Sequence, residues 1–333
     1  MARDPILRRH PDRREFLTIG VGVFVALSLP ASLRRYTPLV RRRIPLMGTI
    51  AEIQVADRDE RFAARAIDAA VSELRWVEST MTRFRSDSDI GRANLGAGRD
   101  GVRVTAQSGA VIATALRVAS ASDGRFDPAI GAVSELWDVL NRHEPPAPDR
   151  VQRLAARDMW RKVDVAADAG SDGALVRFND PDLRLDLGAI AKGYAIDRAA
   201  GALRSRGVRH AIITVGGDLY ALGRSPEGEP WTVGIRSPHD RDELVSTLHV
   251  SDRAVATSGD YERFFSWRGH RYHHLIDPLT AAPRSTPFHS ATVLADRCMD
   301  ADAAATAIFG LPRDAALAIA RRLDTTADVI PLT

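Results

Sequence analysis

The chain has 333 residues, 45% of them hydrophobic, which is enough for one large domain or two with a substantial core. Its formal charge of +3 is unevenly distributed: residues 1–43 contain ten arginines and three acidic side chains, so residues 44–333 are mildly acidic. The sequence has no basic stripe with interleaved aromatic residues, which argues against nucleic-acid binding. A single cysteine, Cys298, excludes an internal disulfide.

The first 33 residues have the pattern of an export leader rather than of a folded segment. Arg13 and Arg14 precede Phe16 in the twin-arginine form, and an apolar stretch follows at residues 19–31. This stretch is shorter than the roughly 20 residues that span a bilayer. The pattern predicts export by the twin-arginine route to a periplasmic or other extracytoplasmic site, with membrane contact only through the leader. An arginine-rich arm ahead of a short core helix is the alternative.

The arginines of residues 34–43 predict a stem between the leader and a single domain of residues 44–333. Cleavage near Ala31 and retention of the leader as a membrane anchor both fit this arrangement. No cysteine lies directly after the apolar stretch, which argues against a lipoprotein-type lipid anchor.

Hydrophobic periodicity predicts the elements of the first half of the domain. Residues 49–55 alternate and predict a strand, and the apolar residues of 61–81 recur at helical spacing. Residues 86–101 are polar and glycine-rich, which predicts a loop. Residues 105–122 predict a second helix, with Thr105 as its N-cap and Gly124 as its stop.

The rest of the domain is expected to contain more strands than helices. A surface loop at 141–148 and a helix at 149–157 are expected before strands at 175–178 and 183–187, a helix at 189–206 and a strand at 211–215. Further strands are predicted at 231–235, 247–250, 254–257, 264–267, 272–276 and 289–294, and helices at 300–309 and 312–323. Strands outnumber helices and mostly follow one another, which favours an α+β fold of layered mixed or antiparallel sheets with packed helices.

Lys192 is one of only two lysines in a chain that otherwise uses arginine. An ammonium is a compact point charge whereas a guanidinium is a planar fork, so a lysine here indicates a tight contact, for example with a phosphate. The predicted strand and the turn at Gly188 place Lys192 about one turn inside a helix, whose N-terminus attracts anions. Chance and an ordinary strand-to-helix junction are the alternatives, and no P-loop pattern is present.

Asp302 and Thr306 are four residues apart in a predicted helix, so their side chains share one face. A carboxylate and a hydroxyl in this arrangement can bind a hard cation such as Mg²⁺ through oxygen. The neighbouring alanines leave room for a ligand to approach. A buried aspartate bonded to the backbone is the alternative for this pair.

Three histidines and Asp277 fall within a short segment, and two of them are adjacent. His273 and His274 point to opposite faces of a strand, so at most one faces a site. A zinc site of His270, His273, His274 and Asp277 is disfavoured, because the spacing is poor and no thiolate joins it. Upstream, a turn at residues 124–131 offers an aromatic ring and a carboxylate against which a flavin or nucleotide ring could pack.

Taken together, these motifs resemble the ApbE family of FAD:protein FMN transferases. The order and spacing of the short motifs carry the resemblance, which runs from Met47 to about Leu311. The motifs are Met47-Gly-Thr49, Thr82-Arg-Phe84 with Ser88 and Asn94, Arg125-Phe-Asp-Pro128, Asp186-Leu-Gly-Ala-Ile-Ala-Lys-Gly-Tyr194, Gly216-Gly-Asp218, Ser258-Gly-Asp-Tyr261, His274-Leu-Ile-Asp-Pro278 and Ala301-Asp-Ala-Ala-Ala-Thr306.

The resemblance implies an ApbE-like, T-fold-like structure and a reaction in which FAD is the substrate, bound with Mg²⁺ across its pyrophosphate. A threonine hydroxyl of an acceptor flavoprotein attacks the FMN phosphorus, and AMP leaves. By motif position, Asp302, Thr306 and the carbonyl of Ala189 are expected to bind Mg²⁺, and Asp302 and His274 to serve catalysis, His274 as general base. The residues expected to bind FAD are Met47, Phe84, Arg125, Phe126, Asp127, Asp186, Lys192, Ser258, Asp260, Tyr261 and Ile276.

The sequence leaves the acceptor open. Ala281 stands where the family usually has glycine after Asp277-Pro-Leu-Thr280, which puts the choice of partner in doubt. A Mg²⁺-dependent FAD pyrophosphatase, with water as acceptor, and an exported FAD-binding protein that stores flavin are the alternative functions. The joint presence of Asp302, Thr306 and His274 favours catalysis over storage.

Overall fold

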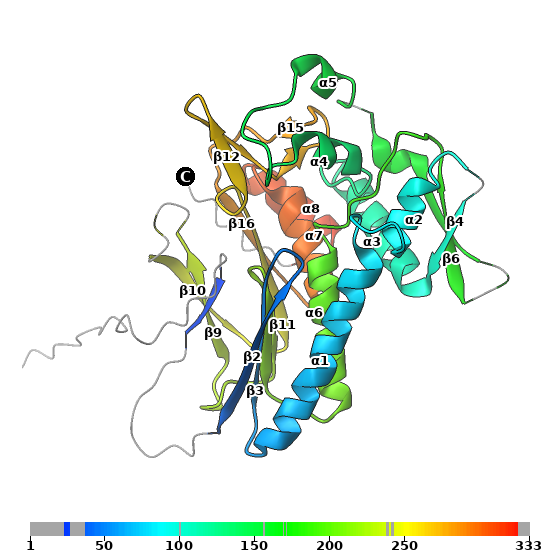
Figure 1. The fold of residues 1–333 in the computed structure, drawn as a ribbon. Helices are drawn as coiled ribbons and strands as arrows, with labels where there is room; N and C mark the ends of the chain where they lie inside the picture. Colours follow the sequence, from blue (N-terminus) through cyan, green and yellow to red (C-terminus); the bar gives the residue numbers. More distant parts are fainter. Residues whose placement is uncertain are drawn as a thin grey trace, which may run out of the picture.

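A six-stranded sheet forms the middle layer of the protein (Figure 1). The computed structural model describes residues 23–26, 37–99, 101–155, 157–168, 170, 172–237, 240 and 243–325. Neighbouring strands of this sheet run antiparallel. Across the sheet the strands are β16 (Ser290–Ala295), β11 (Arg253–Gly259), β8 (Asp218–Leu222), β7 (Ala211–Val215), β3 (Thr49–Ala56) and β2 (Leu39–Leu46).

Three helices cover one face of this sheet. Helix α1 (Glu60–Met81) packs on α6 (Ala191–Ser205), which packs on α7 (Cys298–Ile308), and α7 lies against β11 and β16. The apolar residues of α1 recur at helical spacing and point to the core, and Asp59 caps its N-terminus by accepting from Phe62 N. Helix α7 is built largely from alanine, which allows close approach of its neighbours.

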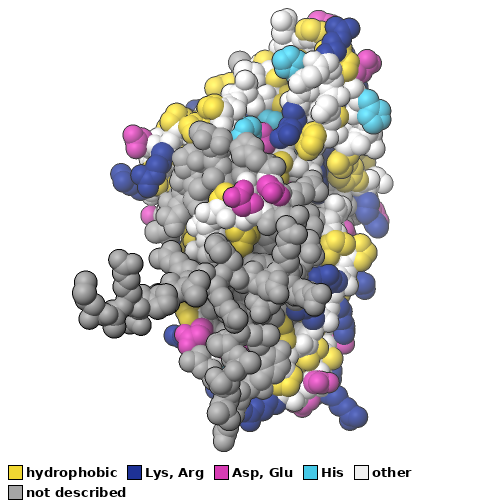
Figure 2. Space-filling view, turned by 90° about the vertical axis from the view of Figure 1, so that its left-hand side faces the viewer, with side chains coloured by type: hydrophobic (Ala, Val, Ile, Leu, Met, Phe, Trp, Pro, Cys, Tyr) yellow, Lys and Arg dark blue, Asp and Glu magenta, His cyan; other side chains and the backbone are white. Residues whose placement is uncertain are grey.

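A smaller sheet covers the opposite face. Strands β1 (Val23–Ala26) and β10 (Leu244–Val250) flank β9 (Trp231–Arg236), and a second hydrophobic core around the fully buried Trp231 separates them from the middle sheet. Figure 2 shows the molecule from this side, with histidine side chains (cyan) in its upper part.

The remaining elements lie to the right of the main sheet and above it in Figure 1. A three-stranded sheet, in the order β4-β6-β5, carries α3 on one side. These elements are α2 (Asp89–Leu95), β4 (Val102–Thr105), α3 (Ala106–Ala121), α4 (Gly131–Trp137), α5 (Pro148–Gln152), η2 (Met159–Lys162), β5 (Val163–Ala167), β6 (Gly173–Phe178), β12 (Phe264–Trp267), β13 (His270–His273), β14 (Ile276–Asp277), β15 (Ala282–Pro283) and α8 (Arg313–Arg322).

The predicted α+β class of layered antiparallel sheets with packed helices is confirmed. The strand at 49–55 and the helices at 61–81, 105–122, 189–206 and 300–309 are present within a few residues of their predicted bounds. Thr105 caps α3 as predicted, by accepting from Ser108 N.

The predicted strand at residues 183–187 is wrong. The segment is extended and its alternate leucines are buried, but the side chain of Asn94 replaces a neighbouring strand: its Oδ1 accepts from Leu185 N at 2.7 Å and its Nδ2 donates to Leu185 O at 3.0 Å. Next to this contact, Asp186 N donates to Pro128 O. The alternating pattern therefore predicted correctly which side chains are buried, but it did not predict which groups the backbone would hydrogen-bond.

Two further expectations need correction. The predicted loop at residues 86–101 contains the short helix α2, whose N-cap Ser88 accepts from Gly91 N. The predicted strand at 272–276 is divided into β13 and β14 by a bend at His274, which changes the direction in which that side chain points.

The twin-arginine pair lies outside the described residues, and of the predicted leader only β1 is described. Residues 39–43, in the segment expected to form a stem, belong to β2 and so to the folded domain. No helix in the described part of the chain is long and apolar enough to cross a membrane.

Candidate active site

Lys192 lies in the first turn of α6 and donates to carboxylates from two other elements. Its Nζ is 2.6 Å from Oδ2 of Asp218, at the start of β8, and 2.8 Å from Oδ1 of Asp302 on α7. The two carboxylates are almost completely buried, whereas the Lys192 side chain keeps 22% of its surface exposed. The ammonium therefore joins sheet and helices and forms the accessible side of the cluster.

The charges of this cluster depend on one another. Burial alone would lower the pKa of Lys192, but Asp218 and Asp302 outweigh it and raise that pKa above its usual range, so the ammonium is charged at pH 7. Burial, and next the charge of Asp302, raise the pKa of Asp218 to about 7 against the opposing effect of Lys192. A further cation beside Asp218 would favour its ionised form.

Asp302 is held by the backbone of α6. Gly193 N donates to Oδ2 of Asp302 at 3.0 Å. A Cβ at Gly193 would overlap the carbonyl oxygen of Cys298 and lie 2.7 Å from the Met299 Cα. Only glycine therefore allows the two helices to approach so closely that this hydrogen bond forms.

Thr306, one turn along α7, faces the same region. Its Oγ1 lies 3.3 Å from the Oγ of Ser258 on β11. Together with the Asp302 carboxylate, these hydroxyls are hard oxygen ligands of the kind that Mg²⁺ prefers. Within the described ranges, no three His, Cys, Asp or Glu side chains group as a metal site. Asp302, Thr306 and Ser258 thus bring one carboxylate and two hydroxyls to this region.

Ala189, the predicted third metal ligand, lies half-buried in the turn that leads into α6. The carbonyl of Leu187 accepts from Ile190 N and Ala191 N and closes this turn. Ala189 is thus three residues from Lys192, on the segment that positions it.

His273 and His274 bind different parts of the backbone, and only His273 belongs to a strand. His273 is buried, and its ring spans the backbone between Arg284 O and Leu275 N. His274 lies at the bend, and its Nδ1 is 3.3 Å from Arg263 O, which also accepts from His274 N. Because a carbonyl can only accept, Nδ1 carries the proton and Nε2 is left as a base.

The environment of His274 keeps it neutral. The protein packed around the ring, and next the Arg263 guanidinium, lower the pKa of His274, although one side of the residue remains exposed. The charge of Lys192 also lowers the pKa of His274, by a smaller amount. A neutral imidazole with a free Nε2 can accept a proton at pH 7.

Met47 lies in the two-residue turn between β2 and β3 with a φ of 50°, followed by Gly48 with a φ of 68°. Positive φ at both positions is the type I′ geometry, which a methionine rarely adopts. Met47 N donates to Oε1 of Glu78 at 2.5 Å, and Nη2 of Arg263 donates to the carbonyls of Met47 and Gly48. Arg263 therefore connects this turn to His274.

Asp186 and Phe84 lie on either side of Arg83. Oδ2 of Asp186 is 3.1 Å from Nε of Arg83, and its Oδ1 accepts from Gly188 N. The Arg83 guanidinium lies 4.2 Å from the centroid of the Phe84 ring, which is 80% exposed. A ring so exposed beside a cation is free to stack on a planar ligand.

The predicted ring-binding turn at residues 125–127 has mixed exposure. Arg125 is half-buried, and its Nε has no hydrogen-bond partner. Phe126 is 3% exposed and lies in the main core. Asp127 accepts from Ala129 N and Trp160 N, and burial raises the pKa of Asp127 to about 7. Phe126 and Asp127 thus support the turn from inside, and Arg125 is its free polar group.

Asp260, Tyr261 and Ile276 are the last three residues predicted to bind FAD. Asp260 is buried and accepts from Nδ1 of His289 at 2.8 Å. The Tyr261 ring covers Gly259, where a Cβ would lie 2.6 Å from its Cζ. Ile276 is 9% exposed. Asp260 and Ile276 are thus buried, whereas Tyr261 is half-buried.

Ala281 adopts a left-handed conformation, with a φ of 51°. It is completely buried, its N–H donates to Asp277 O, and its carbonyl accepts from Nε1 of Trp137 at 2.7 Å. The turn therefore keeps a backbone geometry that favours glycine, although alanine occupies the position.

The structure brings Lys192 to Asp302, and Ser258 to Thr306 one turn further along α7. It adds Asp218 to the site. This residue was named from the sequence only as part of the Gly216-Gly-Asp218 motif and was given no role. An acidic residue after two glycines, at the start of a buried strand, was the available signal.

Comparison with known proteins identifies relatives along most of the chain. Residues 47–330 match the model of the ApbE family. An FAD:protein FMN transferase of Treponema pallidum is 35% identical over 289 residues, which cover 83% of this chain and 80% of that protein. Another from Haemophilus influenzae is 29% identical and covers 91% and 89%.

A solved structure shares the fold. The flavin transferase ApbE from Vibrio cholerae has a TM-score of 0.74 and 27% sequence identity, and the match covers 87% of this chain and 93% of that one.

Proposed function

Because this chain belongs to the ApbE family, we propose that it transfers FMN from FAD to a threonine hydroxyl of a partner protein, with Mg²⁺, and releases AMP. The chain is an FAD:protein FMN transferase, an activity that its relatives share. The metal, the threonine and the roles of individual residues are the proposed parts. The observation that carries them is the oxygen-rich cluster of Asp302, Thr306 and Ser258 beside the charged Lys192.

The cluster fits a pyrophosphate and its counter-ion. Mg²⁺, when bound, would neutralise the pyrophosphate and stabilise the charge that develops on the leaving phosphate. Asp302 and Thr306 would hold it, with the carbonyl of Ala189 as a further ligand. Lys192, already paired with two carboxylates, has one exposed side from which its ammonium can contact a phosphate oxygen.

His274 would accept the proton of the incoming hydroxyl. The oxygen of the acceptor threonine forms a bond to the FMN phosphorus, the bond between the two phosphates breaks, and AMP leaves with the bridging oxygen. The proton of the threonine passes to Nε2 of His274, which the hydrogen bond of Nδ1 to Arg263 O leaves unprotonated. The exposed Phe84 ring and the Met47 turn are suited to contact the flavin or the adenine.

One assay separates transfer from its alternatives. The full chain is incubated with FAD, Mg²⁺ and a flavoprotein that presents a threonine, and the acceptor is examined for flavin fluorescence on a denaturing gel. A fluorescent acceptor that is lost when its threonine is replaced by valine supports the proposal. AMP release without labelled acceptor would indicate an FAD pyrophosphatase, and bound FAD with neither product would indicate a storage protein.

His274→Ala is expected to lower transfer by about 10²-fold to 10⁴-fold, while FAD binding is kept, because a general base contributes to the chemical step. Transfer rates and FAD titration by fluorescence measure the two effects. His270→Ala, an exposed histidine on the same hairpin, is the matched control and should leave both unchanged. Loss of FAD affinity in His274→Ala would instead make it a pocket residue.

Lys192→Arg is expected to lower transfer by about tenfold or more, because a guanidinium cannot replace an ammonium held between two close carboxylates. Transfer is measured at saturating FAD, together with thermal unfolding. Lys162→Arg changes the other lysine, which pairs with Asp180 near the surface, and serves as the control. Equal rates for the two variants would show that the shape of the Lys192 cation is unimportant.

We further propose that the chain is exported through the twin-arginine route. The support is the Arg13-Arg14 pair followed by a short apolar stretch. Replacing both arginines by lysine in a reporter fusion tests this, since continued export of that fusion would refute it.

A further inference from the structure

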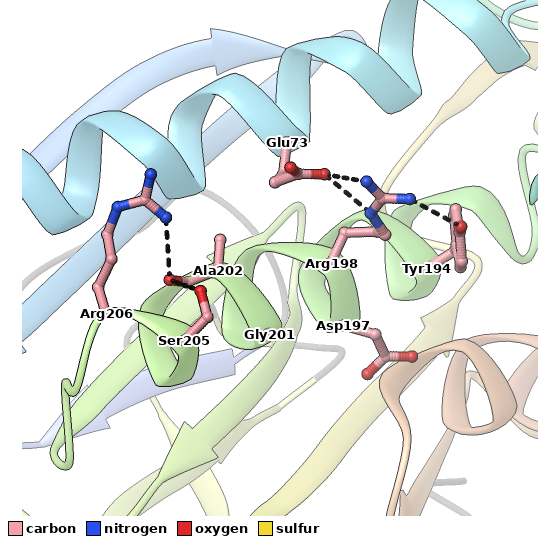
Figure 3. A pocket seen from close by; sticks show the side chains of 8 residues that line it. All are labelled: Glu73, Tyr194, Asp197, Arg198, Gly201, Ala202, Ser205 and Arg206. Atoms are coloured by element: carbon pink, nitrogen blue, oxygen red, sulfur yellow. Dashed lines mark hydrogen bonds and ion pairs between the residues drawn. The ribbon is translucent and has the colours of Figure 1, made fainter.

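Helix α7, which carries Asp302 and Thr306, has no side-chain cap of its own at its N-terminus. Its N-cap residue, Arg297, pairs instead with Asp300. The free N–H groups of the first turn are bonded by a side chain from another helix: Asp197 on α6 accepts from Cys298 N at 2.7 Å and from Met299 N at 2.9 Å. Figure 3 shows this carboxylate pointing away from the neighbouring Arg198.

The other end of α7 is bonded by Arg284, which follows β15. Its Nη1 donates to the carbonyls of Thr306 and Phe309 at 2.9 and 2.8 Å, and its Nη2 donates to Arg125 O. Arg284 is only 6% exposed. No ion pair between Arg284 and an acidic side chain is found among the described residues. A buried guanidinium bonded to backbone carbonyls is well suited to complement a helix C-terminus.

The signs of the two charges match the dipole of the helix. A carboxylate at the N-terminus and a cation at the C-terminus both stabilise a helix, and each effect is larger when partly buried. Burial raises the pKa of Asp197 to about 6 and lowers the pKa of Arg284 to about 10, so both are charged near pH 7.5. Asp302 lies between the two contacts, and Thr306 provides one of the carbonyls that Arg284 binds.

We propose that Asp197 and Arg284 form a clamp on the two ends of α7 that positions Asp302 and Thr306 for binding the cation. This inference rests on the proposed function, in which these two residues hold Mg²⁺. Both members of the clamp are positioning residues, because their hydrogen bonds reach the backbone of α7 rather than the proposed metal-binding atoms. Side chains that orient metal ligands in this way typically change metal affinity by about 10- to 100-fold when they are replaced.

The clamp predicts a specific change in the use of Mg²⁺. In the full chain, Asp197→Asn and Arg284→Met are expected to raise the Mg²⁺ concentration for half-maximal transfer by about tenfold or more, with the rate at saturating Mg²⁺ nearly unchanged. The increase in Tm that Mg²⁺ produces in the presence of FAD should be smaller in both variants, which gives a readout independent of turnover. The conservative variants Asp197→Glu and Arg284→Lys should recover part of the affinity.

Two controls remove charges of the same kind but leave the hydrogen bonds of the clamp in place. Asp300→Asn removes a carboxylate from the first turn of α7, and Arg322→Met removes a guanidinium that pairs with Asp123 at the surface. Both should keep the wild-type Mg²⁺ requirement.

Two results would overturn the inference in different ways. In the first, the wild type requires Mg²⁺, and the clamp variants lose stability but need no more Mg²⁺ than the wild type does. The clamp is then wrong and the proposed function stands. If Asp197→Asn or Arg284→Met fails to fold, the conservative variants provide the same test. If the wild type itself transfers flavin without a divalent cation, the metal assignment is wrong, and the clamp fails with it.

Discussion

Asp302→Ala is expected to abolish Mg²⁺-dependent flavin transfer, with a loss of about 10³-fold or more, because a metal contributes several kcal/mol to the stabilisation of phosphoryl transfer. Asp302 supplies the carboxylate of the proposed cation site, and the remaining acid of the cluster, Asp218, is already bonded to Lys192. Transfer is measured over a range of Mg²⁺ concentrations, since a weakened site would respond to excess metal and a lost site would not.

The fold should survive this substitution. Asp302 loses its hydrogen bond from Gly193 N and its pairing with Lys192, a destabilisation on the order of 1–3 kcal/mol, and Lys192 keeps Asp218 as its partner. Asp300→Ala, on the same helix but paired with Arg297, is the matched control and should retain transfer. Full turnover of Asp302→Ala at the wild-type Mg²⁺ concentration would refute the metal assignment.

Asp302→Asn separates charge from shape. The amide has the size of the carboxylate but cannot balance the Lys192 ammonium or bind a hard cation as strongly. If charge is what matters, the asparagine variant should be nearly as inactive as the alanine variant. If it keeps most of the rate, the role of Asp302 is to hold α6 and α7 together rather than to bind a cation.

The elements that were predicted correctly have a hydrophobic pattern that fits one kind of secondary structure. Helix α1 repeats its apolar residues over six turns, and β7 is an apolar run that ends at two glycines. The sheet β4-β6-β5 was missed in part because β4 is four residues long and follows a glycine-rich segment. Residues 183–187 alternate as a strand does, and sequence contains no sign that Asn94, about 90 residues away, would bond their backbone.

In the candidate site, too, some residues could be predicted from the sequence and others could not. Asp302 and Thr306 could be singled out from local spacing, because a helix places residues four apart on one face, and Lys192 from the scarcity of lysine in the chain. That Lys192 would bond Asp302 directly could not, since the two are 110 residues apart and only the packing of α6 on α7 brings them together. The roles of Asp197 and Arg284 are equally hidden, because each acts on the backbone of a distant helix.

The close packing of α6 on α7 rests on one residue, and Gly193→Ala is expected to destabilise the protein by about 3 kcal/mol. The new methyl group would overlap the Cys298 carbonyl and lie 2.7 Å from the Met299 Cα, and backbone atoms cannot rotate away as a side chain would. Any relaxation must separate the helices, which lengthens the hydrogen bond from Gly193 N to Asp302. Chemical denaturation measures the loss, and the transfer rate should fall with it.

Gly201→Ala provides the matched control on the same helix. A Cβ at Gly201 would meet nothing within 4 Å, so this change should instead stabilise the protein by about 0.5–1 kcal/mol, through the higher helix propensity of alanine. Opposite signs for two glycine-to-alanine changes on one helix would isolate the contact between α6 and α7 as the cause. If Gly193→Ala were as stable as the wild type and lost transfer alone, the close approach would serve to position Asp302 and not to hold the fold together.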